Sequence, residues 1–128
     1  VSPETVLIDS DDAEIVPELG ISIDQSKRGI VSETLEPLLY KRLEIKKMLL
    51  DLSRYDCRRA SLEARSSALK WLLVVSFGYL GYKRFRWGRI EAHEAVTAYS
   101  REGLLRAKEA AEDMGFEVLH MYVDGIWV

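Results

Sequence analysis

Two segments with a helical repeat of apolar side chains, separated by one short break, constrain the fold of this chain more than any other feature. The first begins near Ser32, the second covers about residues 57–77, and the break lies at residues 53–56. Ser32 or Thr34 is the predicted N-cap of the first helix. Because the connection is short, the two helices are predicted to form an antiparallel hairpin. The side chains predicted to face inward are Leu35, Leu38, Leu39, Ile45, Leu49, Leu52, Leu62, Leu69, Leu72 and Leu73.

A third helix is predicted over about residues 91–114. Small and apolar residues recur there at steps of three and four, which favours close packing on a sheet, and Gly115 is the candidate C-cap. The recurring residues are Ala92, Val96, Tyr99, Gly103, Ala107, Ala110 and Met114. Residues 116–123 are predicted to form a strand, Asp124 and Gly125 a tight turn, and residues 126–128 the returning strand. The predicted fold class is therefore α+β, with a helical hairpin, one long helix and a β-hairpin.

The first 31 residues are predicted to be irregular, with at most short strands, because proline and glycine are scattered through them. This segment is also acidic, and no Lys or Arg occurs before residue 25. We interpret carboxylates such as Asp9, Asp11 and Asp12 as a solvated loop, since they lack the ligand spacing of a calcium loop. The predicted parts of the chain are residues 1–31, 32–82 and 83–128.

The composition permits one ordinary domain core, with 128 residues of which 48% are apolar. A net charge of -3 argues against a uniform nucleic-acid coat, although Lys and Arg outnumber Asp and Glu between Lys41 and Lys70. The single cysteine, Cys57, permits no internal disulfide and fits a reducing cytoplasm. The longest apolar run, residues 71–75, is too short to span a bilayer, so no membrane partner is expected.

Residues 70–87 join an apolar helix to an aromatic and basic tail that contains two glycines. Lys70, Val74 and Phe77 share one helical face. Stacking planes, positive charge and close backbone approach together suit a polynucleotide backbone. The alternative is an ordinary aromatic turn at the end of a helix. The candidate DNA-binding residues are Gly78, Tyr79, Gly81, Tyr82, Arg84 and Arg86.

This stretch resembles the fingers motif of family B DNA polymerases, in which K-x-x-x-N-S-x-Y-G is followed by Y-x-G-Y and a basic tail. The chain departs from the motif at Val74, Val75 and Phe77, where the family has Asn, Ser and Tyr. Residues 119–125 resemble the family's palm motif, D-T-D-G. Only its second aspartate is present, as Asp124, and Tyr122 stands in place of the first.

Two further segments resemble the same family, so the similarity runs in order along nearly the whole chain and is weakest at residues 7–30. Residues 1–5 are similar to the segment after the first palm motif, and residues 91–101 to a helix with the pattern E-x-x-E-x-V-T-A-x-x-R. The resemblance implies fingers and part of the palm, and its altered motifs resemble an archaeal subgroup of paralogues thought to have lost catalysis. The lack of an initiator Met and the apolar end suggest a piece of a longer polymerase, with exposed apolar surface and self-association.

The resemblance also implies a nucleotide site. In the family, the residues at the positions of Arg42, Lys46 and Lys70 grip the triphosphate of the incoming nucleotide, and a polyanion needs convergent cations. A solvated helix face is the alternative for these three. Asp124 is either a relic of the catalytic, metal-binding pair or a turn former. Family catalysis uses two magnesium ions held by carboxylates, and Tyr122 is a poor magnesium ligand because it is neutral at physiological pH.

The expected function is binding of primer-template DNA, and of a deoxynucleoside triphosphate, in replication or repair by a catalytically inactive polymerase. Magnesium is expected only if the protein is active. The first alternative is an active, template-directed nucleotidyltransferase in the longer protein. The second is a scaffold that binds replication proteins.

Overall fold

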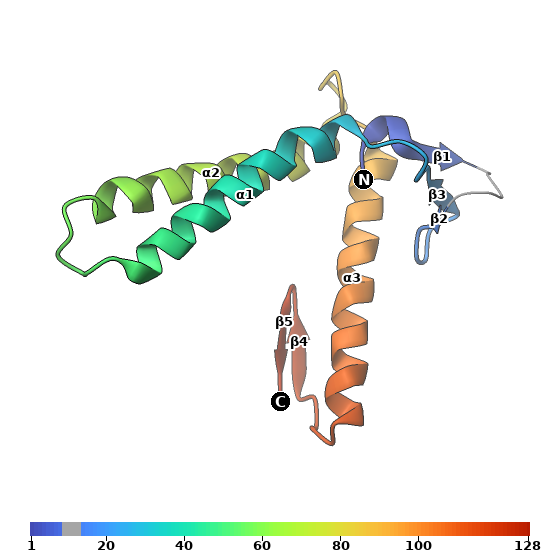
Figure 1. Cartoon of the computed structure of the whole chain (residues 1–128). Helices are drawn as coiled ribbons and strands as arrows, with labels where there is room; N and C mark the ends of the chain where they lie inside the picture. Colours follow the sequence, from blue (N-terminus) through green and yellow to red (C-terminus); the bar gives the residue numbers. More distant parts are fainter. Residues whose placement is uncertain (9–13) are drawn as a thin grey trace.

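Three long helices and two small antiparallel sheets make up the protein, as seen in a computed structural model that describes residues 1–8 and 14–128. The helical hairpin projects away from the third helix, and the C-terminal strands lie beside the far half of that helix (Figure 1). The predicted α+β class is confirmed. The elements in order are η1 (Pro3–Thr5), β1 (Val6–Ile8), β2 (Glu14–Ile15), β3 (Ile21–Ile23), α1 (Ile30–Asp51), α2 (Arg59–Leu80), α3 (Ile90–Asp113), β4 (His120–Tyr122) and β5 (Gly125–Trp127).

Helices α1 and α2 form the predicted antiparallel hairpin (Figure 1). Along α2, and along α1 from Leu38 onward, the buried and half-buried positions recur at alternating steps of three and four residues, the spacing of two helices that pack along a narrow seam. Arg42 lies in the middle of this otherwise apolar seam on α1. The seam consists of Leu35, Leu38, Arg42, Ile45 and Leu49 on α1, of Leu52 at the C-cap of α1, and of Arg59, Leu62, Ser66, Leu69, Leu73, Ser76 and Leu80 on α2.

The predicted start of the first helix is wrong by a few residues, because Gly29, and neither Ser32 nor Thr34, is the N-cap. The acceptors for the first free amides come from far away in the sequence. Glu4 Oε1 accepts a hydrogen bond from the Ile30 amide, and Ser2 Oγ accepts one from the Val31 amide at 3.1 Å. A Cβ atom on Gly29 would lie 2.2 Å from Ser2 Oγ, so this junction requires glycine.

Two further expectations for the hairpin need correction. Helix α2 continues to Leu80, so Gly78 and Tyr79 belong to its last turn and not to the following loop. Leu39 and Leu72 were expected to face inward, yet they are 42% and 54% exposed. Both lie beside the seam, and a hairpin of only two helices leaves its flanks uncovered.

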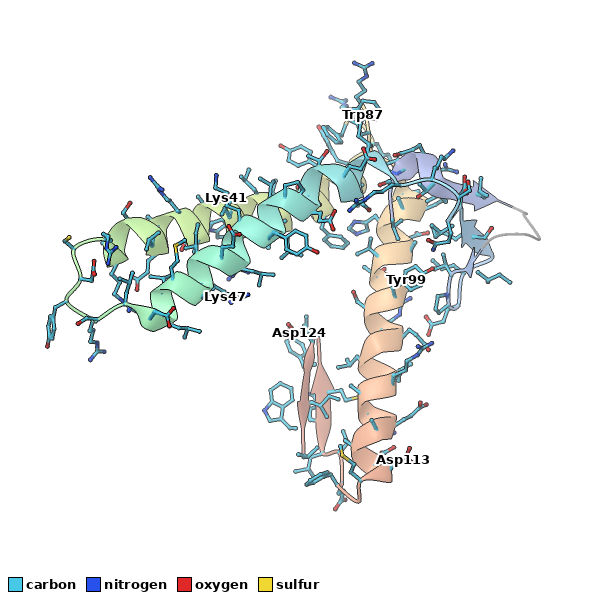
Figure 2. The ribbon with its side chains drawn as sticks, viewed as in Figure 1. Lys41, Lys47, Trp87, Tyr99, Asp113 and Asp124 are labelled. Carbon is cyan, nitrogen blue, oxygen red and sulfur yellow. The ribbon has the colours of Figure 1, made fainter. Side chains whose placement is uncertain are left out.

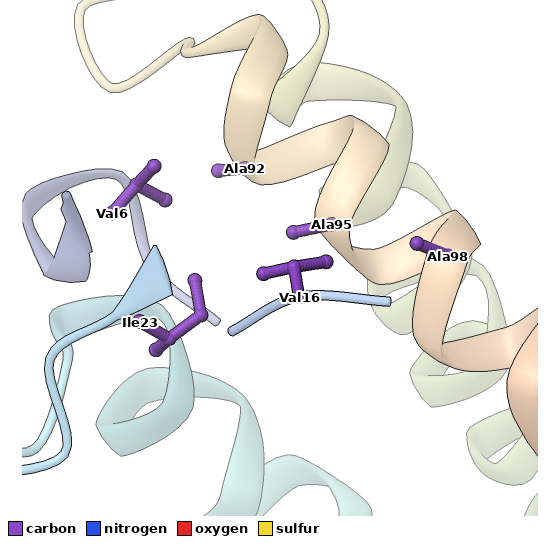
Figure 3. Packing of buried hydrophobic residues seen from close by; sticks show 6 residues of the cluster. All are labelled: Val6, Val16, Ile23, Ala92, Ala95 and Ala98. Carbon is purple, nitrogen blue, oxygen red and sulfur yellow. The ribbon is translucent and has the colours of Figure 1, made fainter. Parts of the chain in front are cut away.

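The N-terminal sheet packs against the first half of α3. Its strand order is β1-β3-β2, with all pairs antiparallel and Val6 opposite Ile23. Figure 3 shows its apolar side chains meeting Ala92, Ala95 and Ala98, so small residues of this helix do pack on a sheet. Of the predicted row, however, only Ala92 belongs to this core, Tyr99 packs against it, and the members from Gly103 onward are exposed. Asp9, Asp11 and Asp12, interpreted as a solvated loop, lie outside the described residues. The core cluster contains Val6, Val16, Ile23, Ala92, Ala95 and Ala98.

The C-terminal hairpin is shorter than predicted. Strand β4 covers only His120–Tyr122, and Tyr122 pairs with Gly125. The two-residue turn is therefore formed by Val123 and Asp124, one residue earlier than the predicted turn. Val123 adopts a positive φ of 56° in this turn.

Candidate nucleic-acid interface

Arg42 is the most unusual side chain of the hairpin, because it is a cation at a seam position between α1 and α2. It is half-buried, and its Nε is fully buried without a hydrogen-bond partner among the described residues. Buried polar atoms of folded proteins nearly always have a partner. An unsatisfied guanidinium donor therefore suggests that a ligand, or a part of a longer protein, completes this site.

Lys46 on α1 and Lys70 on α2 are both exposed. Neither has an ion-pair partner within residues 1–8 and 14–128. By contrast, the nearby Arg59 pairs with Glu63 at 2.9 Å, and Arg58 pairs with Asp56 at 2.8 Å. The positive charges of Lys46 and Lys70 are thus available for a ligand.

Three grooves run along the α1–α2 hairpin, and their lining residues show which side chains lie on the same side of it. The groove that faces α3, with a volume of about 370 Å³, is lined by Leu39 of α1, Phe77 of α2 and Val96 of α3, among others. A second groove, on the opposite side, is lined by Lys41 and Arg65. The third, apolar groove of about 470 Å³ lies at the base of the hairpin and includes Thr34, Leu72, Val75, Tyr79 and Trp87.

The face of α2 that carries Lys70 continues to a contact with α3. The rings of Phe77 and His93 stack with centroids 4.1 Å apart and planes inclined by 20°, and His93 Nδ1 lies 3.2 Å from the Phe77 carbonyl oxygen. His93 is therefore a packing residue at the junction of the hairpin and α3. Val74 and Val75, which replace the polar residues of the fingers motif, are 52% and 45% exposed, so packing within the described residues does not account for them.

The candidate DNA-binding residues of segment 78–87 present exposed rings and cations at the end of α2. Tyr79 lies in contact with Phe85 and Tyr82, with ring centroids 5.1 and 6.3 Å apart, and the guanidinium of Arg86 lies 5.3 Å from the Trp87 ring centroid. A Cβ atom on Gly81 would lie 3.2 Å from the His93 ring, whereas one on Gly78 would have no neighbour within 4 Å. Lys83, Arg84 and Arg86 are exposed.

Sequence reasoning missed three residues that hold this region in place. A Cβ atom on Gly88 would lie 2.2 Å from the Tyr82 carbonyl oxygen, so the tight loop requires glycine there. Arg89 Nη1 donates hydrogen bonds to the Pro3 and Val6 carbonyl oxygens at 2.9 and 3.0 Å, which ties the start of α3 to the N-terminal segment. Glu4 caps α1 from 26 residues away. Such contacts leave no signal in local sequence patterns.

Asp124 lies exposed in the turn of the C-terminal hairpin (Figure 2) and lines a shallow pocket with Ser100, Gly103 and Ile126. A two-magnesium site needs several carboxylate oxygens around the ions. Among the described residues, no group of three Asp, Glu, His or Cys side chains is arranged to hold a metal ion. The donor set of this part of the chain therefore does not fit a magnesium pair.

None of the described helices combines the length and the apolar character that crossing a lipid bilayer requires.

Comparisons with known proteins agree with the motifs. The family model described as DNA polymerase family B matches residues 4–124. DNA polymerase 2 of Saccharolobus solfataricus is 42% identical over 107 residues, which are 84% of this chain and 15% of that protein. The DNA polymerase of Archaeoglobus fulgidus is 34% identical over 128 residues, which are 100% of this chain and 16% of that protein.

A solved structure shares the fold. The family B DNA polymerase from the hyperthermophilic archaeon Pyrobaculum calidifontis superposes with a TM-score of 0.79 at 28% identity, over 98% of this chain and 17% of that one. The chain thus spans 15–17% of the length of these proteins. With the family model matching most of the chain and the helical hairpin, long helix and β-hairpin in the same arrangement, this chain belongs to family B of the DNA polymerases.

Proposed function

We propose that this chain holds nucleotide and DNA for a family B DNA polymerase in replication or repair, and that its own palm residues do not support catalysis. Arg42, Lys46 and Lys70 hold the triphosphate of a deoxynucleoside triphosphate. The exposed rings and cations of segment 78–87 contact primer-template DNA.

The helical repeat indicates that Arg42, Lys46 and Lys70 lie on the same side of the hairpin. Seven residues make nearly two turns of an α-helix, so residues seven apart point to the same side. Arg42 follows Leu35 by seven residues, Lys46 follows Leu39 by seven, and Lys70 precedes Phe77 by seven. Leu35, Leu39 and Phe77 all line the groove that faces α3. The three cations therefore extend this side of the hairpin toward its tip.

The observation that carries the proposal is that none of Arg42, Lys46 and Lys70 has an ion-pair partner among the described residues. Arg42 is only half-buried, and charged hydrogen bonds between guanidinium and phosphate are among the strongest in proteins. Lys46 and Lys70 add point charges with no competing carboxylate partner among the described side chains. A polyanion on this side would thus pair with three positive charges together.

Segment 78–87 suits a nucleic-acid strand for a different reason. Tyr79 and Tyr82 are about half exposed and offer ring faces, while Arg84 and Arg86 offer charge to the backbone. Stacking tolerates any base, because each base has a flat face. This surface would contribute affinity with little sequence preference, as a polymerase requires.

Catalysis is proposed to be absent because the acidic site is incomplete. Magnesium, when bound to a family B site, stabilises the charge that develops on the reacting phosphate. Asp124 is the one carboxylate that this chain places in its hairpin turn, and Tyr122 offers no charge next to it. The residues of this chain would bind and orient substrates without holding the metal pair.

A matched pair of triple variants tests the nucleotide site. Each charged hydrogen bond to phosphate contributes on the order of 1.5–3 kcal/mol, and less where exposed. Arg42→Ala, Lys46→Ala and Lys70→Ala together should therefore weaken binding of a fluorescent deoxynucleoside triphosphate by at least about tenfold. Fluorescence anisotropy at low salt measures this change, and wild-type binding should weaken as salt rises.

The control is Lys41→Ala, Lys47→Ala and Arg65→Ala, which removes the same charges from other sides of the hairpin. Circular dichroism verifies that both variants are folded. Equal loss of binding in both would mean that only total charge matters, and unchanged binding in the first would exclude the proposed site.

A further inference from the structure

We propose that the loop joining α1 to α2, residues 52–58, is a separate binding site for single-stranded DNA, in which a base stacks on Tyr55 and a phosphate pairs with Arg54. This site goes beyond the proposed nucleotide site, since it shares no residue with it. It lies at the end of the hairpin that is farthest from α3 (Figure 1).

The loop is held in shape by its own hydrogen bonds. Arg59 Nη1 donates to the carbonyl oxygens of Leu49 and Leu52, at 3.3 and 3.2 Å, and so closes the C-terminus of α1. Asp56 Oδ1 accepts from the Arg58 amide at 2.8 Å, and the Asp56 amide donates to the Ser53 carbonyl oxygen at 3.2 Å. A loop ordered in this way loses little conformational freedom when it binds a partner.

Tyr55 lies on this ordered loop and is almost fully exposed to solvent. Its side chain is 94% exposed, the highest value among the exposed large apolar and aromatic side chains of the described residues. Its amide is fixed by Ser53 Oγ at 3.4 Å, while its ring has no aromatic neighbour among the contacts of the described residues. An exposed aromatic ring on a fixed backbone is the stacking platform that single-strand-binding proteins use.

Among the charged side chains of the loop, Arg54 is the one that favours an anionic partner. Arg58 is neutralised by a two-point pair with Asp56, and Arg59 pairs with Glu63. Arg54 is exposed and has no ion pair among the described residues, so its charge is free for a phosphate. Asp51, at the end of α1, is the remaining exposed carboxylate close by in sequence, and it limits affinity at low salt.

Single-stranded DNA fits these features better than an acidic protein or duplex DNA does. An acidic peptide would use Arg54 and leave the exposed ring of Tyr55 without a role. In duplex DNA the base faces are already stacked on one another, so a ring at the end of a loop reaches only edges and backbone. A single strand offers unstacked bases and phosphates together.

A dinucleotide bound at the loop does not need the nucleotide site. Along α1, five residues separate Lys46 from Asp51 and nine separate Arg42 from Asp51, which correspond to rises of about 7.5 and 13.5 Å. A dinucleotide held by one base on Tyr55 and one phosphate on Arg54 would therefore bind independently of Arg42, Lys46 and Lys70. This independence makes the two proposals separable by experiment.

The single cysteine provides the probe. Cys57 is exposed and lies two residues from Tyr55, so an environment-sensitive fluorophore on its thiol reports events at the tip. Titration of the labelled chain with a thymidine dinucleotide, which carries one phosphate, should change the fluorescence saturably. The apparent Kd should rise about fivefold or more in Tyr55→Ala and should be nearly unchanged in Tyr55→Phe, which keeps the ring.

Arg54→Ala should weaken binding and reduce the slope of log K against log salt by about 0.7, the contribution of one phosphate contact to a single strand. Tyr40→Ala is the matched control, because Tyr40 is another exposed tyrosine of the hairpin, on α1. It should bind like wild type, as should the triple variant at Arg42, Lys46 and Lys70.

Four results would overturn the proposal. The first is wild-type affinity in Tyr55→Ala, and the second is an equal loss in Tyr40→Ala. The third is a fluorescence response to polyglutamate that equals the response to DNA and does not depend on Tyr55, which would indicate an acidic protein partner. Loss of tip binding in the triple variant would show that the tip is an extension of the nucleotide site and would likewise overturn its independence.

Discussion

Val123 stands in a backbone conformation that β-branched residues rarely adopt. Its φ of 56° lies in the left-handed region, and a residue there that is neither Gly nor Asn stores about 1–3 kcal/mol of strain. The neighbouring Asp124 shows no positive φ, so the turn has the form that prefers glycine at its first central position. Strain of this kind is common next to functional residues, and here it sits beside the candidate metal-binding aspartate.

Val123→Gly should raise the free energy of unfolding by about 1 kcal/mol, because relief of strain exceeds the extra entropy of glycine in the unfolded chain. Urea denaturation measures the change. Val118→Gly is the control, since Val118 lies just before the same hairpin without a positive φ, and it should be destabilising. A Val123→Gly variant less stable than wild type would show that the turn is not strained.

Cross-strand packing explains why the turn is displaced by one residue from its predicted position. Asp-Gly is a strong hairpin signal. In the structure, however, the rings of His120 and Trp127 face each other across a strand pair with centroids 5.5 Å apart, and the Trp127 ring lies over Gly125. This pairing makes Gly125 a strand residue. Register is decided by such pairs, which local turn propensity does not report.

At the scale of elements, the long helices were predictable and their ends were not. The sequence predicts most of the apolar seam residues of α1 and α2, whereas on α3 it predicts only Ala92 of the three alanines that pack on the sheet. The cap of α1 comes from Ser2 and Glu4, and the loop before α3 closes because Gly88 permits a close approach. The start of α1 thus depends on partners that are remote in sequence, and the loop before α3 depends on a position that has no room for a Cβ atom.

The tip loop allows a prediction about pH. A side-chain hydrogen bond from Arg58, followed by one from its backbone amide, lowers the pKa of Asp56 from 3.8 to about 2. Because the folded pKa lies below the unfolded value, the ionised carboxylate stabilises the folded chain above about pH 4, and this contribution is lost as the pH falls toward 2.

Asp56→Asn should therefore lower Tm at pH 7, and the difference from wild type should shrink between pH 4 and 2. The effect is modest because the pair is exposed to solvent. Asp51→Asn removes a nearby carboxylate that has no ion-pair partner among the described residues. Its difference in Tm from wild type should not shrink between pH 4 and 2. A difference that stays constant from pH 7 to pH 2 would contradict the assigned pKa.

At the scale of the whole molecule, much apolar surface remains exposed. Leu50 is 85% exposed, and Trp71, Leu72 and Met114 are all more than half exposed. Patches of this kind mark interfaces with other protein surfaces. The expected exposure is thus present, while the self-association that it implies stays a prediction for light scattering of the purified chain.

The proposed loss of catalysis can be tested in a chimaera, in which residues 1–128 replace the matching segment of the Archaeoglobus fulgidus DNA polymerase. Primer extension should fall by about 10²-fold or more, because Tyr122 cannot supply the charge of a metal-binding carboxylate. Tyr122→Asp should recover part of the activity. Adding Val74→Asn and Val75→Ser should recover more, since these side chains restore hydrogen-bonding groups.

The unmodified relative provides the reference rate, and primer-template binding by the chimaera verifies that it is folded. Magnesium-dependent synthesis by the chimaera at the reference rate, abolished by Asp124→Ala, would instead support the alternative of an active polymerase. In that case Asp124 would work with ligands outside this chain.

The sequence by itself determined the α+β class, the helical hairpin and the polymerase motifs, because apolar periodicity and motif spacing are local properties of the chain. Only the tertiary structure decided that Arg42 lies in the helical seam with a buried, unpartnered donor, that His93 stacks on Phe77, and that Tyr55 is displayed on an ordered tip. These features depend on which surfaces meet in space. Burial, partner choice and strand register are set by contacts between distant segments, and no local pattern encodes them.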